Sequence, residues 1–341
     1  MKAEIETKCA TTRCLSRRAF AAVAAAAGAS LLFGCSSESD TADVATDAST
    51  GKTLVVGTLA TEDILPLWVA QSEGLFDDAG LDVQIMPFQS ATELIAGVAS
   101  GDAQMAMTDI MVTASMFASD IDVNMQWVTL GTSADQGRFG IMAEPDSSIE
   151  QLTDLAGVPI GVGSNTILEY VMDKLMEAAG IPEEQIVVEE LQKLPVRYQA
   201  MASGEVAAAA LPGTLLALGE ANGCKLIADD TSGENLSQSV MIARADLLAS
   251  DGGVDQVEAL KGVWDAAVQM INDDPEAYRS VLVANANLPE EIADTYPIST
   301  YPTAQLPTSE MVDPVLEWME HKGYLTQPLA YDAASGSFAA A

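Results

Sequence analysis

The stretch DVQIMPFQSATELIAGVASGDAQMAM, residues 82–107, holds an amphipathic segment between two short apolar ones. Ser90 and Glu93 have the spacing of a capping box, which predicts the start of a helix, and Gly101 stands where that helix should end. The flanking apolar segments are short and bounded by turn residues, as buried strands are. We therefore expect a strand, a helix and a second strand, the unit from which parallel sheets are built.

The same alternation of short apolar runs and amphipathic segments extends from Thr53 to about Asp230. It predicts an α/β fold, with helices on the faces of a parallel or mixed sheet. A second capping box, Ser147 to Glu150, predicts a further helix start. After Asp246 the pattern predicts helices only. The predicted strands are 53–57, 82–86, 105–107, 125–131, 139–143, 159–162, 186–189, 206–210, 225–228 and 239–242, and the predicted C-terminal helices are 254–273, 275–284, 289–295 and 308–322.

Composition and charge exclude several classes of function. The chain has 341 residues, 49% of them hydrophobic, with 15 basic and 50 acidic residues and a formal net charge of -35. Nucleic acid is bound by clustered Lys and Arg, which such an acidic chain lacks. We therefore expect no nucleic-acid partner. The single histidine, His321, leaves little room for a charge-relay triad or a histidine metal site. We predict no catalytic residue, no metal and no cofactor.

The N-terminus has the pattern of an export signal, predicted at 1–34. Basic residues precede an Ala-rich apolar run that is shorter than the roughly 20 residues of a membrane-spanning helix. Residues 16–20 resemble the twin-arginine export motif, although a basic region that feeds the general secretory route would look similar. Residues 32–35 resemble a bacterial lipobox, which predicts acylation of Cys35. Residues 35–51 would then be a lipid-anchored flexible tether, on the extracytoplasmic face of the cell membrane.

Three groups of motifs follow one another along the chain. The first group is GLF at 74–76, GLDV at 80–83 and LIAGVASGD at 94–102, the second is SI at 148–149 with DLAGVPIGV at 154–162, and the third is QAMASGEVAAAALP at 199–212 with GCKLIADD at 223–230. In this order they resemble the motifs of bacterial solute-binding receptors for ABC importers. The first group resembles the opening lobe of such receptors, and the second resembles the beginning of their second lobe. The third is similar to the sulfonate, taurine and nitrate branch, whose sequence-family domain also includes thiamine-pyrimidine-synthase-like proteins. Together the motifs cover most of residues 53–245.

The resemblance implies a type II periplasmic-binding-protein fold, with two α/β lobes, a hinge and a central ligand cleft. Lobe 1 would consist of residues 52–134 and 238–341, with the helical C-terminal part packed on it, and lobe 2 of residues 135–237. The chain would cross between the lobes near 132–138 and 231–239. The implied function is that of a non-catalytic, monomeric receptor that delivers a small-molecule ligand to an ABC permease and its ATPase.

Two departures from the family pattern leave the ligand class open. Family members commonly carry an aspartate at the position of Ala207 and an acidic residue at that of Gly213. The resemblance implies a ligand of the sulfonate, taurine and nitrate class, and a thiamine pyrimidine precursor or related heterocycle is the alternative. An exported enzyme on the same scaffold is a further alternative, although the sequence has no nucleophile elbow and no Cys/His ligand spacing.

In open α/β lobes, ligands bind beyond the carboxyl ends of the strands, where loops meet helix N-termini. Such loops carry most of the candidates, and the third family motif supplies one more in its Leu-Pro pair. Helix capping explains Ser90 and Ser164 equally well. The arginines fit either an anion or an ion pair within the protein, and the acidic residues fit an amine-bearing ligand or solvent. The candidate ligand-binding residues are Thr61, Glu62, Ser90, Thr108, Asp109, Arg138, Ser164, Asn165, Arg197 and Pro212.

Overall fold

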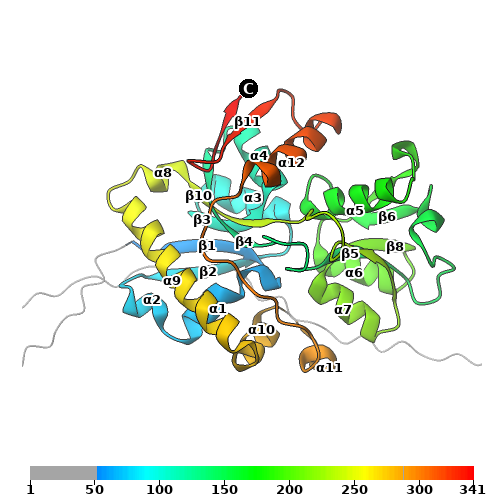
Figure 1. Cartoon of the computed structure of the whole chain (residues 1–341), viewed down its shortest axis with the longest axis horizontal. Helices are drawn as coiled ribbons and strands as arrows, with labels where there is room; N and C mark the ends of the chain where they lie inside the picture. The colour runs from blue at the N-terminus through cyan, green and yellow to red at the C-terminus, as the bar shows by residue number, and fades with distance from the viewer. Residues whose placement is uncertain (1–51, 287) are drawn as a thin grey trace, which may run out of the picture. The chain divides into compact units, whose positions relative to one another are not determined.

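The computed structural model describes residues 52–286 and 288–341. The predicted export signal, Cys35 and the rest of the predicted tether lie outside these residues. No described helix has both the length and the hydropathy that a membrane span requires. Two five-stranded sheets organise the described chain, and helices pack against each of them (Figure 1). The predicted α/β class is confirmed.

The first sheet combines N-terminal strands with one strand from later in the chain. Its strands are β1 Leu54–Leu59, β2 Val83–Phe88, β3 Met105–Asp109, β4 Val123–Leu130 and β10 Ser239–Arg244. Their order is β2-β1-β3-β10-β4; β1 pairs in parallel with β2 and β3, and β10 runs antiparallel between β3 and β4. Successive side chains alternate between the two faces, so Met241 joins one hydrophobic cluster while Val240 and Ile242 join the other.

Helices cover both faces of the first sheet. They are α1 Leu65–Ser72, α2 Leu75–Asp78, α3 Ala91–Ser100, α4 Ile110–Ala118, α8 Ala245–Leu248 and α9 Gly253–Asp273, and the 3₁₀ helix η1 spans Glu62–Ile64. α3 and α4 belong to one hydrophobic cluster, whereas α1 and α9 pack together in the other. The predicted start of α3 is confirmed, because Ser90 Oγ accepts a hydrogen bond from the Glu93 N–H at 3.2 Å and Gly101 ends the helix in a left-handed conformation.

The second sheet has the order β7-β6-β8-β5-β9 and forms the green region of Figure 1. Its strands are β5 Phe139–Ala143, β6 Pro159–Val162, β7 Val187–Glu190, β8 Ala208–Pro212 and β9 Lys225–Asp229. α5 packs with one set of alternating strand residues, and α6 and α7 pack with the other set. The helices are α5 Ile167–Ala178, α6 Leu194–Ala202 and α7 Gly213–Ala221, with the 3₁₀ helices η2 Leu152–Leu155 and η3 Glu183–Gln185.

The chain passes from one sheet to the other twice, between β4 and β5 and between β9 and β10. The two passages touch at Gly131, whose carbonyl accepts a hydrogen bond from Asn235 Nδ2 at 2.8 Å. Gly131 has a φ of +92°, and a Cβ there would overlap the carbonyl oxygen of Ser237. Only glycine fits both the backbone conformation and the close approach.

Two sequence predictions are wrong. A capping box does not form at Ser147, because its Oγ accepts the N–H of Ile149 in a turn and η2 is instead capped by Gln151 and Asp154. The C-terminal part is not entirely helical, since β11 Leu329–Asp332 and β12 Ser337–Ala340 form an antiparallel hairpin. Each of the two strands buries one residue, and Phe338 of β12 packs on Phe117 of α4, so contacts with the rest of the fold hold this pair.

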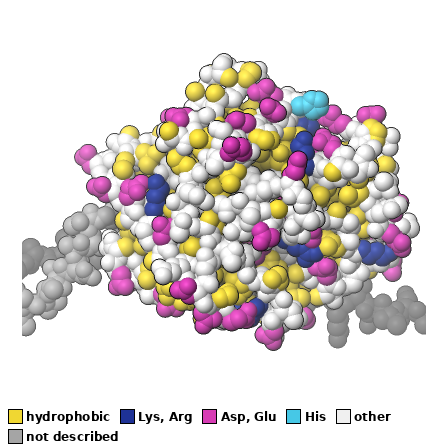
Figure 2. Space-filling view, in the orientation of Figure 1, with side chains coloured by type: hydrophobic (Ala, Val, Ile, Leu, Met, Phe, Trp, Pro, Cys, Tyr) yellow, Lys and Arg dark blue, Asp and Glu magenta, His cyan; other side chains and the backbone are white. Residues whose placement is uncertain are grey.

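The remaining helices follow α9. They are η4 Pro275–Tyr278, α10 Arg279–Asn285, α11 Glu290–Ala293 and α12 Ser309–His321. α12 packs against α4 beside the first sheet, and its Trp318 Nε1 also donates to Asp173 Oδ2 of α5 at 2.9 Å. The C-terminal segment therefore contacts helices that belong to both sheets. Figure 2 shows acidic side chains spread over the visible face, with Lys and Arg at few places.

Candidate ligand-binding site

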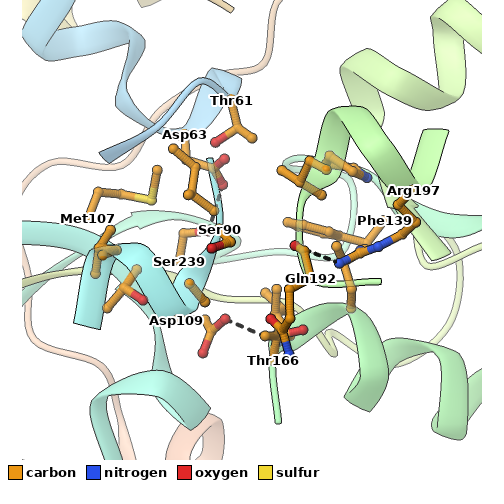
Figure 3. Close-up of a pocket in the computed structure, with 18 residues that line it drawn as sticks. Thr61, Asp63, Ser90, Met107, Asp109, Phe139, Thr166, Gln192, Arg197 and Ser239 are labelled. Carbon is orange, nitrogen blue, oxygen red and sulfur yellow. Dashed lines mark hydrogen bonds between the residues drawn. The ribbon is translucent and has the colours of Figure 1, made fainter. Parts of the chain in front are cut away.

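A cavity of about 60 Å³ lies between the two sheets, where the carboxyl ends of β1, β3 and β8 meet. Its wall is mainly apolar, with a smaller set of polar and charged side chains from both sides (Figure 3). Small-molecule sites typically have this composition. The lining residues are Leu59, Thr61, Asp63, Ser90, Ala91, Leu94, Met107, Thr108, Asp109, Phe139, Thr166, Ile167, Leu168, Gln192, Leu194, Arg197, Pro212 and Ser239.

The structure brings together some of the candidate residues from the sequence and leaves others apart. Those that line the cavity are Thr61, Ser90, Thr108, Asp109, Arg197 and Pro212. Thr61 follows β1, Thr108 and Asp109 end β3, and Pro212 ends β8, so strand ends position most of them. Ser90 both caps α3 and faces the cavity, which makes its two interpretations compatible.

Asp109 accepts hydrogen bonds from helices beside both sheets. Its Oδ1 accepts the N–H of Val112 at 2.7 Å, and its Oδ2 accepts the N–H of Ile167 at 3.1 Å. Val112 lies in the first turn of α4 beside the first sheet, whereas Ile167 is the first residue of α5 beside the second. Burial outweighs these hydrogen bonds and raises the pKa of Asp109 to about 6, so the carboxylate is mostly ionised at neutral pH.

Arg197 enters the cavity wall from α6 and is 2% exposed. Its Nε donates to the carbonyl of Leu191 at 2.8 Å, Nη1 to that of Ala210 at 3.0 Å, and Nη2 to that of Gln192 at 3.3 Å. No described carboxylate lies within ion-pair distance of it. Burial lowers the pKa of the guanidinium to about 10, so it remains charged at neutral pH.

Glu62 and Arg138 line a different and wider cavity of about 670 Å³. Glu62 is buried, and its Oε1 accepts the hydroxyl of Tyr296 at 2.8 Å. Burial, with Asp63 beside it, raises the pKa of Glu62 to about 8. Arg138 forms ion pairs with Glu220 at 2.9 Å and Asp229 at 2.7 Å. Of the two interpretations of Arg138, the structure shows the ion pair within the protein.

Ser164 and Asn165 contact protein groups outside the first cavity. Ser164 Oγ donates to Glu190 Oε2 at 2.5 Å. Asn165 has a φ of +58°, a conformation that asparagine tolerates better than most residues, and its Nδ2 donates to Ser115 Oγ at 2.6 Å. The next residue, Thr166, lines the cavity instead.

Sequence reasoning did not select several residues of the wall. Asp63 follows the candidate Glu62 directly. It is 4% exposed, and its Oδ1 accepts the Ser239 hydroxyl at 2.6 Å. Phe139 and Ser239 each begin a strand directly after a passage between the sheets. Position at those passages was the signal that could have identified them. Thr166 belongs to the same predicted ligand loop, 163–166, as Ser164 and Asn165, and Met107 belongs to a series of methionines that is typical of core packing. Gln192 has no distinguishing pattern.

The described residues offer little equipment for covalent chemistry. Cys224 is the described cysteine, and it is buried among Tyr198, Met142 and other apolar residues away from the cavity. Across residues 52–286 and 288–341, no group of three or more His, Cys, Asp or Glu residues could hold a metal ion. His321 is on the surface, where its Nε2 lies 2.8 Å from Glu183.

The fold and this cavity define a class of protein, the periplasmic-binding-protein fold with a site between two α/β lobes. Residues 61–278 match the family model described as NMT1/THI5 like, and the chain belongs to this family. The resemblance found in the sequence is confirmed at this level. No curated protein sequence matches the chain significantly.

Solved structures with the same fold include binding proteins and an enzyme. The alkanesulfonate-binding protein SsuA of Xanthomonas axonopodis pv. citri, bound to MOPS, has a TM-score of 0.70 and 16% identity, over 81% of this chain and 95% of that one. The ligand-binding component of an ABC-type import system from Staphylococcus aureus, with zinc bound, has a TM-score of 0.71 and 13% identity, over 83% and 96%. A cysteine-to-serine mutant of DSZB in complex with biphenyl-2-sulfinic acid has a TM-score of 0.61 and 16% identity, over 81% and 94%. At these identities the likeness concerns the fold.

Proposed function

We propose that this protein is the solute-binding component of an ABC importer. The observation that carries the proposal is the cavity itself, whose wall is shared by strand ends of two sheets that are joined by two close passages of chain. Such a site can be opened and enclosed by a hinge movement, which is how two-lobed receptors capture a solute. Partners would be a membrane permease and its ATPase, and the receptor would act as a monomer.

The lobes follow from the same proposal. Lobe 1 would consist of residues 52–134 and 238–341, and lobe 2 of residues 135–237, which assigns one five-stranded sheet to each lobe and the C-terminal hairpin to lobe 1. An export signal at 1–34 and acylation of Cys35 would hold the receptor at the outer side of the cell membrane. Mass spectrometry of the protein expressed in a bacterial host tests this part, because diacylglycerol on Cys35 is lost in Cys35→Ser.

The ligand that we propose is a small solute of the sulfonate, taurine and nitrate class, with a pyrimidine precursor of thiamine as the second candidate. The sequence motifs support the first class, and SsuA, which has the same fold, binds an alkanesulfonate according to its description. The family model supports the second candidate.

An exported enzyme is the competing function, and DSZB, described as a desulfurization enzyme, has the same fold. The cavity wall of this chain combines Ser, Thr, Asp and Arg with apolar side chains, and Cys224 lies elsewhere. The wall therefore resembles a binding site more than a nucleophilic one.

Native mass spectrometry of residues 36–341 separates these functions. The purified protein is measured alone and after mixing with pools of sulfonates, nitrate, carboxylates, amino acids and pyrimidines. A receptor gains one stoichiometric mass, and its melting temperature rises with ligand concentration because the ligand binds only the folded state. Conversion of a compound to a product of different mass would instead establish the enzyme.

A further inference from the structure

The wall of the cavity of about 60 Å³ contains more acidic than basic side chains. Two carboxylates, Asp63 and Asp109, enter it from the first sheet, and one guanidinium, that of Arg197, enters from the second. Figure 3 shows the two carboxylates on one side of the cavity and Arg197 on the other. If all three are ionised, the wall carries an excess of one negative charge.

Asp63 has no cationic partner within the described chain. Its Oδ1 accepts the Ser239 hydroxyl at 2.6 Å, and it forms no ion pair with any described residue. A buried carboxylate is expensive unless a positive group or several hydrogen-bond donors compensate it. One side of Asp63 faces the cavity, where a ligand can supply that compensation.

The other two charged residues already have structural partners. Asp109 accepts one backbone N–H at each oxygen, and Arg197 donates to the carbonyls of Leu191, Gln192 and Ala210. Arg197 thus links the middle of β8 to the loop before α6 and forms no ion pair with Asp63. An anionic ligand would add to the net negative charge of the cavity wall, whereas a ligand with one positive charge would neutralise that net charge.

We propose that the ligand carries a cationic nitrogen, which Asp63 holds with help from Asp109, while Leu94, Met107 and Phe139 pack around its apolar part. The inference rests on the proposed receptor function and narrows it. Within the sulfonate class it retains amino-sulfonates and excludes plain alkanesulfonates and nitrate. Within the pyrimidine class it requires a protonated ring or amine.

The size of the cavity limits the ligand further. A group the size of a water molecule occupies about 10–15 Å³ of cavity volume. The cavity, with its volume of about 60 Å³, therefore accommodates roughly four to six such groups. A solute of a few heavy atoms therefore fits the cavity. A longer ligand has to extend toward the adjoining groove, which shares Thr61, Leu194 and Pro212 with the cavity wall.

Matched pairs of probes test the proposal by calorimetry and thermal shift at neutral pH. Taurine and ethanesulfonate differ only in the amino group. Choline and neohexyl alcohol have the same substituents around one central atom, which is a positively charged nitrogen in choline and an uncharged carbon in the alcohol. We expect the cationic member of at least one pair to bind and to raise the melting temperature, and the uncharged or purely anionic member to have no effect.

The variant Asp63→Asn provides the site-specific readout. Its amide oxygen can still accept the Ser239 hydroxyl, so the fold is preserved while the charge is lost. Affinity for the cationic probe should fall at least about tenfold, as expected for loss of a charge-assisted bond. Asp313→Asn, on the exposed side of α12, is the matched control and should leave affinity unchanged.

The outcomes separate this inference from the proposed function. If ethanesulfonate binds as tightly as taurine, or if Asp63→Asn binds the cationic probe as tightly as the parent protein, the cationic requirement is overturned and the receptor function stands. If no probe of either kind, and no compound from the wider pools, changes the mass or the melting temperature, the receptor function fails together with the inference.

Discussion

Asp109 at the end of β3 joins the two sides of the cavity by accepting the backbone N–H of Ile167 at the start of α5, with 3.1 Å between Oδ2 and N. Its other oxygen caps α4 through Val112 at 2.7 Å. One carboxylate thus caps the N-terminal ends of two helices, one beside each sheet. Of its two bonds, only the one to Ile167 connects the first sheet with a helix that packs on the second sheet.

Hydrogen exchange should distinguish these two bonds. If the lobes open by a hinge movement, the amide of Ile167 loses its acceptor while the amide of Val112 keeps it. We expect Ile167 to exchange at least about tenfold faster than Val112 in the free protein, and to be slowed by ligand. Amide-resolved NMR measures both. Equal protection of the two amides, unchanged by ligand, would be incompatible with opening at this contact.

Glu62 should make stability depend on pH. Its pKa is about 8 in the folded protein against 4.5 for the ordinary group. The folded state retains a proton that the unfolded state releases, so this contribution is fully present below about pH 4.5 and is lost as pH rises through about 8.

The isostere Glu62→Gln removes that dependence. Its amide oxygen can still accept the Tyr296 hydroxyl, and at about pH 8 the variant should be more stable than the parent by on the order of 2 kcal/mol. Urea unfolding at several pH values measures the difference. The exposed Glu184→Gln serves as the control and should follow the parent at every pH. A Glu62→Gln curve parallel to the parent would show that Glu62 does not titrate in this range.

Lys322 neutralises carboxylates between α12 and α5. Its Nζ lies 3.0 Å from Asp173 and 3.3 Å from Glu169, and both carboxylate side chains are 2% exposed. Lys322→Met leaves them buried without a cation and should lower the free energy of unfolding by about 3 kcal/mol. Lys261→Met is the matched control, because its partner Glu258 is 61% exposed and the loss should stay below about 1 kcal/mol. Equal losses in the two variants would mean that burial of the pair contributes nothing.

Gly131 should tolerate no side chain. Its φ of +92° and its approach to Ser237 mean that Gly131→Ala strains the point where the two passages touch. We expect a loss of more than about 2 kcal/mol. Gly262 lies on the exposed side of α9 with open space around it, so Gly262→Ala should instead stabilise the protein by about 0.5–1 kcal/mol. Thermal and urea unfolding measure both, and a neutral Gly131→Ala would disprove the close contact.

The sequence alone determined the order of strands and helices up to β10. These elements are encoded locally, by short apolar runs, by the cap at Ser90 and by glycines such as Gly101 that end helices. The boundaries of β5 and β6 were predicted without error, because apolar residues with clear turn signals on both sides define them. The family motifs also indicated the loops that border the cavity.

Tertiary structure decided which side chains of those loops face the cavity. At the start of η1, Thr61 and Asp63 face the cavity, whereas Glu62 faces Tyr296. The residue types alone do not reveal these directions. The C-terminal hairpin forms only against the rest of the fold, where Phe338 packs on Phe117 with ring centroids 5.9 Å apart. Asp109 and Ile167 are 58 residues apart, so only the folded chain brings the carboxylate to that helix. Local patterns set the elements, whereas long-range contacts set the direction of each side chain and therefore the chemistry of the site.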